Sequence, residues 1–319
     1  MPRAPLPRDW ASLIALAVLW GSSFLFIKLA LVSFSPASIV AGRVLVAAVV
    51  LFALLMASGA RRPGSWRDWQ PMLVMALIGN LLPFMLIASA QQHIDSALAG
   101  VLMAIMPLFV LPLAHYFIPG ARLTAGRVAG FVAGFAGVVC IIGPAALADA
   151  SGNTTLWATL AMLGAALSYA VNSIYARRVG LQDPMLLAAG MLLIAGLFAL
   201  PFAAADFAAL AFAPPAPLAA VALLVLGLCS TGLATVLYFR IIQGPGPTFL
   251  SLVNYLVPAW AVLAGAWFLD ETLALTSYAG LALILAGIAL SEFGPRLRQT
   301  LRRRAAARPE PVRMATEDA

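Results

Sequence analysis

The sequence predicts an all-α integral membrane protein with ten transmembrane helices in two inverted five-helix repeats. Three observations predict this fold: ten apolar segments of membrane-spanning length, arginines confined to alternate loops, and motifs of the fourth and fifth segments that recur in the ninth and tenth. The composition agrees, since 63% of residues are hydrophobic, 10% are charged and the mean hydropathy is +0.99. A water-soluble protein of 319 residues with this composition would expose large apolar patches.

Each apolar segment has about the ~20 residues that cross a bilayer as a helix. The first segment follows Arg3 and Arg8 as a signal peptide would, but it is long and lacks a clear small-residue cleavage site, so we expect it to be retained. The predicted spans, numbered one to ten, are 10–32, 36–57, 70–91, 96–118, 126–143, 154–176, 184–204, 217–239, 247–269 and 275–292.

The loops between the spans alternate in charge. Every loop on one side contains arginine, and the loops on the other side contain none. The positive-inside rule therefore predicts that both termini are cytoplasmic, in a multi-pass protein of a bacterial-type inner membrane. The arginine side holds Arg3, Arg8, Arg61, Arg62, Arg67, Arg122, Arg127, Arg177, Arg178, Arg240 and the tail from Arg296 to Arg313, whereas the other side holds His93, Asp95, Asp149, Asp206, Asp270 and Glu271.

The basic character of the chain is explained by its loops. The net charge of +7 resides in the predicted cytoplasmic loops and tail, where it sets orientation and attracts anionic lipid, so no nucleic-acid partner is expected. The two cysteines, Cys140 and Cys229, both lie within spans, which predicts neither a disulfide framework nor a metal cluster. We expect no metal and no cofactor. The short loops leave no room for a soluble catalytic domain, so function must reside in the helix bundle.

An internal repeat divides the chain into two units. Pro107 and Phe117 are spaced ten residues apart, as are Pro258 and Phe268, and two glycines seven residues apart follow in each half, Gly130 with Gly137 and Gly280 with Gly287. Five spans is an odd number, so the second unit must enter the membrane upside down relative to the first. The predicted units are 10–145 and 150–293, followed by a basic cytoplasmic tail, 294–319, which we expect to be disordered.

Several motifs resemble a known family. "WGSSFLFIK" in span one, Arg43 in span two, the proline-centred spans four and nine, and "LDETLALTSYAGLALILAGIAL" at the end are similar to the two EamA domains of the drug/metabolite transporter (DMT) superfamily. The resemblance implies ten helices in two inverted units with a substrate cavity between them, and export of amino acids or other small metabolites. One position departs from the pattern: the acidic residue of the closing motif is Glu271 in the second half but Ala121 in the first.

Pro107 and Pro258 fall near the middle of spans four and nine. Proline cannot donate a hydrogen bond to the carbonyl four residues back, so the carbonyls of Met103 and Asn254 lose their partners. Helix breaks in matching positions of two repeats are typical of a transport site. The alternative is a kink that only shapes packing.

Polar and aromatic side chains gather at helical spacing in spans one, six and nine. Such a pattern describes a cavity with aromatic walls and a few neutral hydrogen-bonding groups. Serine and asparagine also join membrane helices by packing, and this reading stays open for each of them. The candidate substrate-binding residues are Trp20, Ser23 and Phe24, then Ser168, Asn172 and Tyr175, then Ser251, Asn254 and Tyr255.

Two basic residues, Lys28 and Arg43, lie within spans. An ionised group there costs at least ~2.5 kcal/mol, so each should face a cavity or a partner. Lys28 is close enough to the surface to snorkel, whereas Arg43 is deeper. If they are functional, both would attract a carboxylate or another anionic group of the substrate.

No aspartate or glutamate falls in the middle of a predicted span, so a central carboxylate that binds a proton or a cationic drug is not available. The sequence thus favours a carrier that exports small zwitterionic or weakly anionic metabolites, such as amino acids, by alternating access. A receptor or assembly factor on the same fold is the alternative, and an enzyme is disfavoured because the spans hold no recognisable catalytic set. The glycines of span five predict close helix packing, either within the bundle or in a homodimer.

Overall fold

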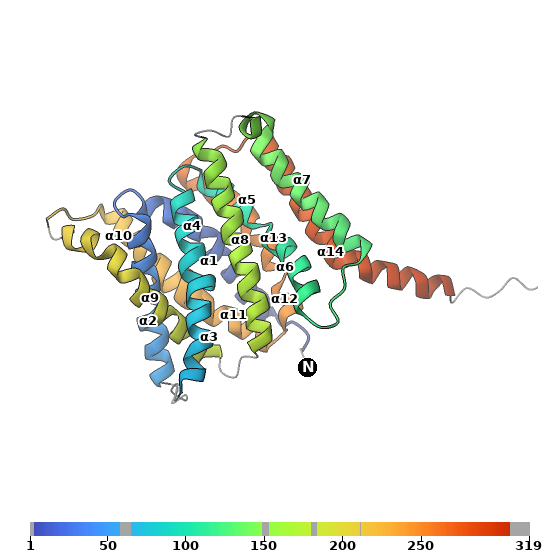
Figure 1. Cartoon of the computed structure of the whole chain (residues 1–319), viewed down its shortest axis with the longest axis horizontal. Helices are drawn as coiled ribbons and strands as arrows, with labels where there is room; N and C mark the ends of the chain where they lie inside the picture. Colours follow the sequence, from blue (N-terminus) through green and yellow to red (C-terminus); the bar gives the residue numbers. More distant parts are fainter. Residues whose placement is uncertain (1–2, 58–64, 149–152, 180–183, 211, 307–319) are drawn as a thin grey trace, which may run out of the picture.

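The computed structural model describes residues 3–57, 65–148, 153–179, 184–210 and 212–306, and these form helices joined by short loops, with no strand among them (Figure 1). Ten helical segments are long and apolar enough to cross a membrane. The predicted ten-helix membrane fold is therefore confirmed. Of the loop charges used to orient the chain, Arg61, Arg62 and Asp149 lie outside the described residues.

The first five spans are built from eight helical elements. Pro36 at the first position of span two suits a helix start, because its missing N–H would have no partner there. Gly143, with φ of 75°, interrupts the helical geometry at the end of span five. The elements are α1 (Pro7–Ala30), α2 (Pro36–Ala57), α3 (Trp66–Ala76), the π-helix η1 (Leu77–Leu81), α4 (Leu82–Ala90), α5 (Ser96–Met103), α6 (Met106–Phe117) and α7 (Ala125–Ala148).

The second five spans repeat this plan, again with a π-helix in their third span and a divided fourth span. Proline begins three of these spans, Pro184, Pro217 and Pro247. The elements are α8 (Thr154–Val179), α9 (Pro184–Ala209), α10 (Pro217–Val225), η2 (Leu226–Leu233), α11 (Ala234–Gln243), α12 (Pro247–Leu250), α13 (Val253–Leu269) and α14 (Leu275–Ala306).

The packing of α7 against α14 shows how the two repeats are related (Figure 1). A Cβ on Gly130 would lie 2.4 Å from the carbonyl oxygen of Gly287, and one on Gly137 would lie 2.6 Å from that of Gly280. The two helices are thus antiparallel. Gly130 faces Gly287, the repeat equivalent of Gly137, and Gly137 faces Gly280, the repeat equivalent of Gly130. Such exchange of equivalent residues is the mark of a two-fold relation, as an inverted repeat requires. These glycines pack the bundle internally.

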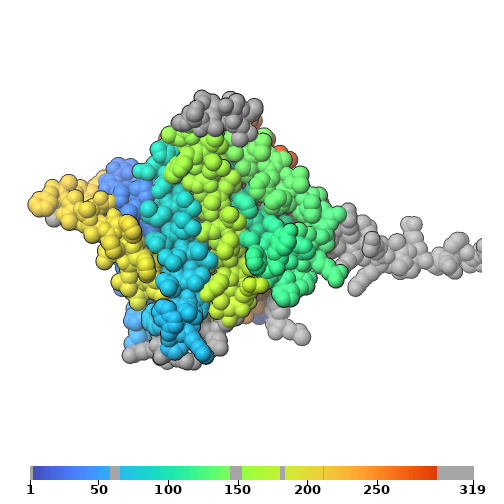
Figure 2. Space-filling model, viewed as in Figure 1, coloured from blue at the N-terminus to red at the C-terminus, as the bar shows by residue number. Residues whose placement is uncertain are grey.

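The outer surface of the bundle is apolar. Large side chains such as Phe198 and Phe202 on α9 and Leu160 on α8 are exposed, and Figure 2 shows these helices side by side with α3 and α4 on one face. Exposed apolar surface of this extent suits contact with lipid. The two ends of the bundle are distinguished below as the arginine end and the acidic end, the latter carrying His93, Asp95, Asp206, Asp270 and Glu271.

The last helix extends into the predicted basic tail. That tail was predicted to cover residues 294–319, and α14 runs as far as Ala306. Alanine, leucine, arginine and glutamine dominate this stretch, and all four have high helix propensity. Residues 307–319 lie outside the described part of the chain.

Candidate substrate-binding site

Two π-helices occupy the same place in the two repeats, η1 in span three and η2 in span eight. A π-helix inserts an extra residue into a turn and disturbs the regular backbone hydrogen bonds, and such turns are common at functional sites. In each, a polar side chain bonds the carbonyl five residues back: Asn80 donates to Met75 at 3.2 Å, and the Thr231 hydroxyl donates to Leu226 at 2.8 Å. The sequence analysis missed both residues.

Arg43 on α2 reaches η2 of the other repeat. Its Nε and Nη2 donate to the Thr231 hydroxyl oxygen at 3.2 and 3.1 Å, and its guanidinium carbon lies 3.7 Å from the centre of the Phe84 ring. The Phe84 ring in turn meets Tyr169 of α8 edge-on, with centroids 6.4 Å apart. The cluster of Arg43, Thr231, Phe84 and Tyr169 therefore draws on four spans from both repeats.

The charge of Arg43 is not neutralised by the described part of the chain. The residue is only 4% exposed, and no carboxylate of the described residues forms an ion pair with it. The Thr231 proton is committed to Leu226, so the hydroxyl acts toward Arg43 only as an acceptor. Nη1 makes no hydrogen bond within the described chain, which leaves one edge of the guanidinium able to take an anionic oxygen.

Two predicted residues of span six lie against η1 of the first repeat. The Ser168 hydroxyl donates to the carbonyl of Ile78 at 2.6 Å. Asn172 packs on Gly79, where a Cβ would come within 2.6 Å of its Nδ2, so a larger residue at position 79 would displace the amide. The Asn172 Oδ1 is buried and has no hydrogen-bond partner among the described residues. The structure thus brings Ser168 and Asn172 to the interface between the repeats.

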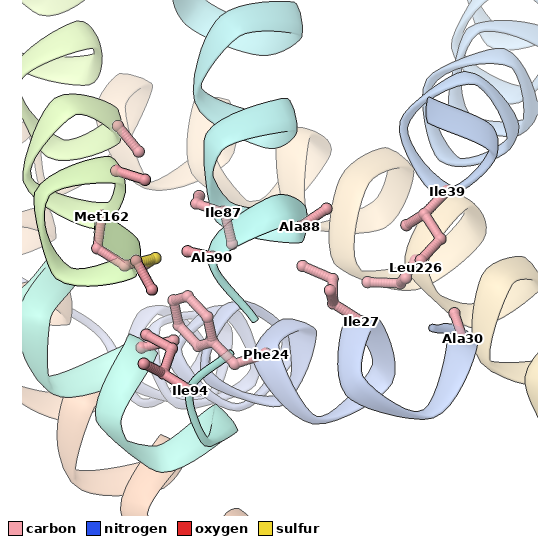
Figure 3. Close-up of a cluster of buried hydrophobic side chains, with 14 of the residues drawn as sticks. Phe24, Ile27, Ala30, Ile39, Ile87, Ala88, Ala90, Ile94, Met162 and Leu226 are labelled. Carbon is pink, nitrogen blue, oxygen red and sulfur yellow. The ribbon is translucent and has the colours of Figure 1, made fainter. Parts of the chain in front are cut away.

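The predicted residues of span one lie in packed surroundings. Trp20 contacts Tyr238 of α11, with ring centroids 5.8 Å apart, and the Ser23 hydroxyl donates to the Trp20 carbonyl of its own helix at 2.6 Å. Phe24 belongs to a buried apolar cluster that draws on both repeats, in which Figure 3 shows it near Ala90 and Ile94.

The remaining predicted side chains are dispersed. Ser251 donates to Thr248 of its own turn at 2.9 Å, and Asn254 is half-buried at the start of α13. Tyr175 packs beside Met72 near the arginine end of α3, whereas Tyr255 packs in a separate cluster with residues of α6, α7 and α14. These four therefore do not join Arg43 in one cluster.

Lys28 has partners of its own. Its ammonium nitrogen donates to the carbonyl oxygens of Gln91 at 3.0 Å and Ile94 at 2.8 Å, where α4 ends. Carbonyls at a helix C-terminus carry partial negative charge and favour a cation. The fold itself thus holds the Lys28 charge, which ties α1 to the turn after α4.

The two prolines differ in their effect. Span four divides at Ala104 and Ile105, next to Pro107 at the second position of α6. In span nine, Pro258 lies inside the continuous helix α13, and the division falls earlier, at Ser251 and Leu252. There the Ser251 side chain bonds its own turn, and the backbone N–H groups of Asn254 and Tyr255 bond carbonyls three residues back. These local bonds compete with the α-helix.

Comparison with known proteins identifies the family. The model of the EamA-like transporter family matches residues 10–143 and 156–293. The chain belongs to this EamA-like transporter family. It is therefore a multi-pass inner-membrane protein that is embedded in the lipid bilayer and transports small molecules.

Several relatives resemble this EamA-like chain over nearly its whole length. The uncharacterized inner membrane transporter YedA of Escherichia coli (strain K12) is 28% identical over 292 residues, covering 89% of this chain and 90% of YedA. A probable terminal-alkyne amino-acid exporter of Streptantibioticus cattleyicolor is 29% identical over 307 residues, covering 94% and 97%. A solved crystal structure matches with a TM-score of 0.62 at 22% identity, covering 90% of this chain and 99% of that one, which supports the fold alone.

Proposed function

We propose that this EamA-like protein exports small metabolites that carry a carboxylate, such as amino acids or related zwitterionic and weakly anionic compounds, by alternating access. The observation that supports this most is the buried Arg43. Its guanidinium is held by Thr231 and Phe84 but is not neutralised by any described carboxylate. A substrate carboxylate would supply the missing charge.

The surroundings of Arg43 favour an anion over other ligands. A buried cation without a counter-ion is costly, and a ligand that provides one regains part of that cost on binding. Phe84 stacks on the guanidinium face and Thr231 holds one edge, which directs the free edge toward a planar anionic group. A cationic drug would meet like charge here. Asn172, with its buried amide oxygen unpartnered, is suited to bind a donor such as an ammonium group.

The relatives support transport of this class. One of them is described as a probable terminal-alkyne amino-acid exporter, and an amino acid carries both the carboxylate and the ammonium group that Arg43 and Asn172 suit. The inverted repeat supports alternating access, because two equivalent units can exchange conformations between inward-open and outward-open states.

Counterflow in proteoliposomes tests the proposal. Vesicles preloaded with an unlabelled amino acid mixture should accelerate the uptake of a labelled member of that mixture. A receptor or assembly factor, the competing function, would bind without moving the label across the membrane. Absence of counterflow over a panel of anionic, zwitterionic and cationic metabolites would contradict a carrier.

We further propose that both termini are cytoplasmic and that the acidic end faces the periplasm. In a variant lacking Cys140 and Cys229, His93→Cys should react with an impermeant thiol reagent in whole cells. Arg178→Cys, at the arginine end, should stay unlabelled until the membrane is made permeable. The reverse pattern would overturn this orientation.

A further inference from the structure

Glu271 joins the two repeats at the acidic end of the bundle. It lies in the turn between α13 and α14, and its carboxylate accepts hydrogen bonds from the first turn of α5 in the other repeat. The Ser96 backbone N–H, the Ser96 hydroxyl and the Ala97 backbone N–H donate at 2.9, 2.8 and 2.8 Å. The side chain of Asp95, the residue before α5, makes no such cap. The cap of α5 is thus supplied from 175 residues away.

The surrounding backbone is shaped for this carboxylate. Asp270 adopts a left-handed conformation with φ of 53°, and the Glu271 N–H donates to the Gly265 carbonyl at 3.2 Å, which folds the turn back over the end of α13. A Cβ on Gly265 would lie 2.4 Å from Glu271 Oε2. Glycine at this position therefore leaves the space that the carboxylate occupies.

The cap lies where spans four and nine are packed together. Small residues bring α5 and α13 close: a Cβ on Gly265 would lie 3.0 Å from that of Ala97, and one on Gly100 would lie 2.3 Å from that of Ala261. At the arginine end, the other halves of the same spans, α6 and α12, make no comparable packing contact among their described residues. The two spans are therefore closed against each other at the acidic end only.

The first repeat has no contact equivalent to the one between Glu271 and α5. The residue equivalent to Glu271 in the first half is Ala121, which has no carboxylate to cap α12 at the arginine end. At the acidic end a second carboxylate crosses between repeats, since Asp206 of α9 accepts hydrogen bonds from Ser35 and, at 2.7 Å, from Ser38 at the start of α2. The carboxylates of Glu271 and Asp206 thus link the two repeats by hydrogen bonds at the acidic end.

We infer that Glu271 is a latch that keeps the acidic end closed, so that α5 can separate from α13 only after its cap is broken. This inference rests on the proposed carrier function only in that opening this end is one step of transport. Because Ala121 offers no equivalent latch, the two states of the carrier differ in stability, and the resting protein favours the state closed at the acidic end. Substrate must shift this balance to be released there.

Thiol labelling of a buried reporter tests the latch without any substrate. Ala104 is buried at the break in span four, one turn inward of Gly100, so Ala104→Cys should become accessible when α5 leaves α13. The background lacks Cys140 and Cys229, and the rate is measured with an impermeant maleimide added at either side. Glu271→Gln should raise the rate from the acidic end about five-fold, the shift expected from losing a charged helix cap.

Asp270→Asn is the matched control, because it removes the same charge one residue away, is exposed, and asparagine tolerates the left-handed conformation. It should change the rate less than two-fold. Ser96→Ala removes only the hydroxyl bond and should raise the rate about two-fold, which provides a test even if Glu271→Gln does not fold. An unchanged rate in Ser96→Ala, an unchanged rate in a folded Glu271→Gln, or an equal rise in Asp270→Asn would overturn the latch. Because no transport is measured, a failure here is separable from a failure of the proposed function.

Discussion

Arg43 and Lys28 are both cations within spans of the first repeat, but the groups that surround their charges differ. Lys28 donates to two backbone carbonyls at the end of α4, so its charge is satisfied within its own repeat. Arg43 meets a hydroxyl and an aromatic ring from two different spans, and neither carries an opposite charge. A charged residue within a span therefore indicates a ligand only when the groups around it do not compensate its charge.

The largest expected effect is at Arg43. Arg43→Gln should lower counterflow at least about 30-fold, because truncating one member of a buried, hydrogen-bonded charge pair costs several kcal/mol. Arg43→Lys keeps the charge but loses the planar fork, so it should recover only part of the activity. Full activity of Arg43→Gln, in protein that is folded and inserted in the membrane, would show that Arg43 has only a structural role, as Lys28 has.

Thr231 should give the next largest effect, by acting through Arg43 as a positioning residue. Thr231→Val preserves shape but removes the acceptor of two guanidinium bonds, so we expect the KM of the carried substrate to rise roughly tenfold, as for a hydrogen bond to a charged group. Thr231→Ser retains the hydroxyl and should stay near the parent KM. Equal kinetics in the valine and serine variants would show that the hydroxyl does not orient Arg43.

Lys28 should affect stability rather than transport. Lys28→Met removes two bonds to carbonyls but keeps the length of the side chain, so we expect a loss of about 1–3 kcal/mol in stability, visible as a lower melting temperature in detergent. The KM should not change. A raised KM with an unchanged melting temperature would reverse the distinction drawn between the two cations.

The smallest effect is expected at the prolines, where the two repeats can be compared directly. Pro107→Ala removes the residue beside the break in span four and should slow counterflow by about two- to five-fold by allowing α5 and α6 to join. Pro258→Ala acts inside a helix that is already continuous and should leave the rate nearly unchanged while raising stability slightly. Equal slowing of counterflow by both substitutions would show that α13 bends at Pro258 during the transport cycle.

The membrane fold could be predicted from sequence because its signals are local. Hydropathy over ~20 residues locates the spans, loop arginines order them, and paired glycines and prolines reveal the repeat. Arg43 could be singled out for a similar reason, since a deep charge is costly wherever the chain folds.

The partners of Arg43 could not be predicted in this way. Thr231 and Phe84 lie in other spans, and the π-helix that carries Thr231 packs against α2 of the other repeat. The only sequence signals were polar residues in mid-span, Asn80 and the Cys229–Ser230–Thr231 run. The position of the break in span nine was missed because local hydrogen bonds around Ser251, rather than Pro258, decide where that helix starts.

Thermal stabilisation of the purified protein by matched ligand pairs tests the central claim most directly. Each pair consists of an amino acid and its methyl ester, which retains the ammonium group but lacks the carboxylate. At least one free acid should raise the melting temperature of the parent protein, its ester should not, and neither should stabilise Arg43→Gln. Equal stabilisation by acid and ester, or stabilisation of Arg43→Gln by the acid, would contradict the assignment of Arg43 as the carboxylate site.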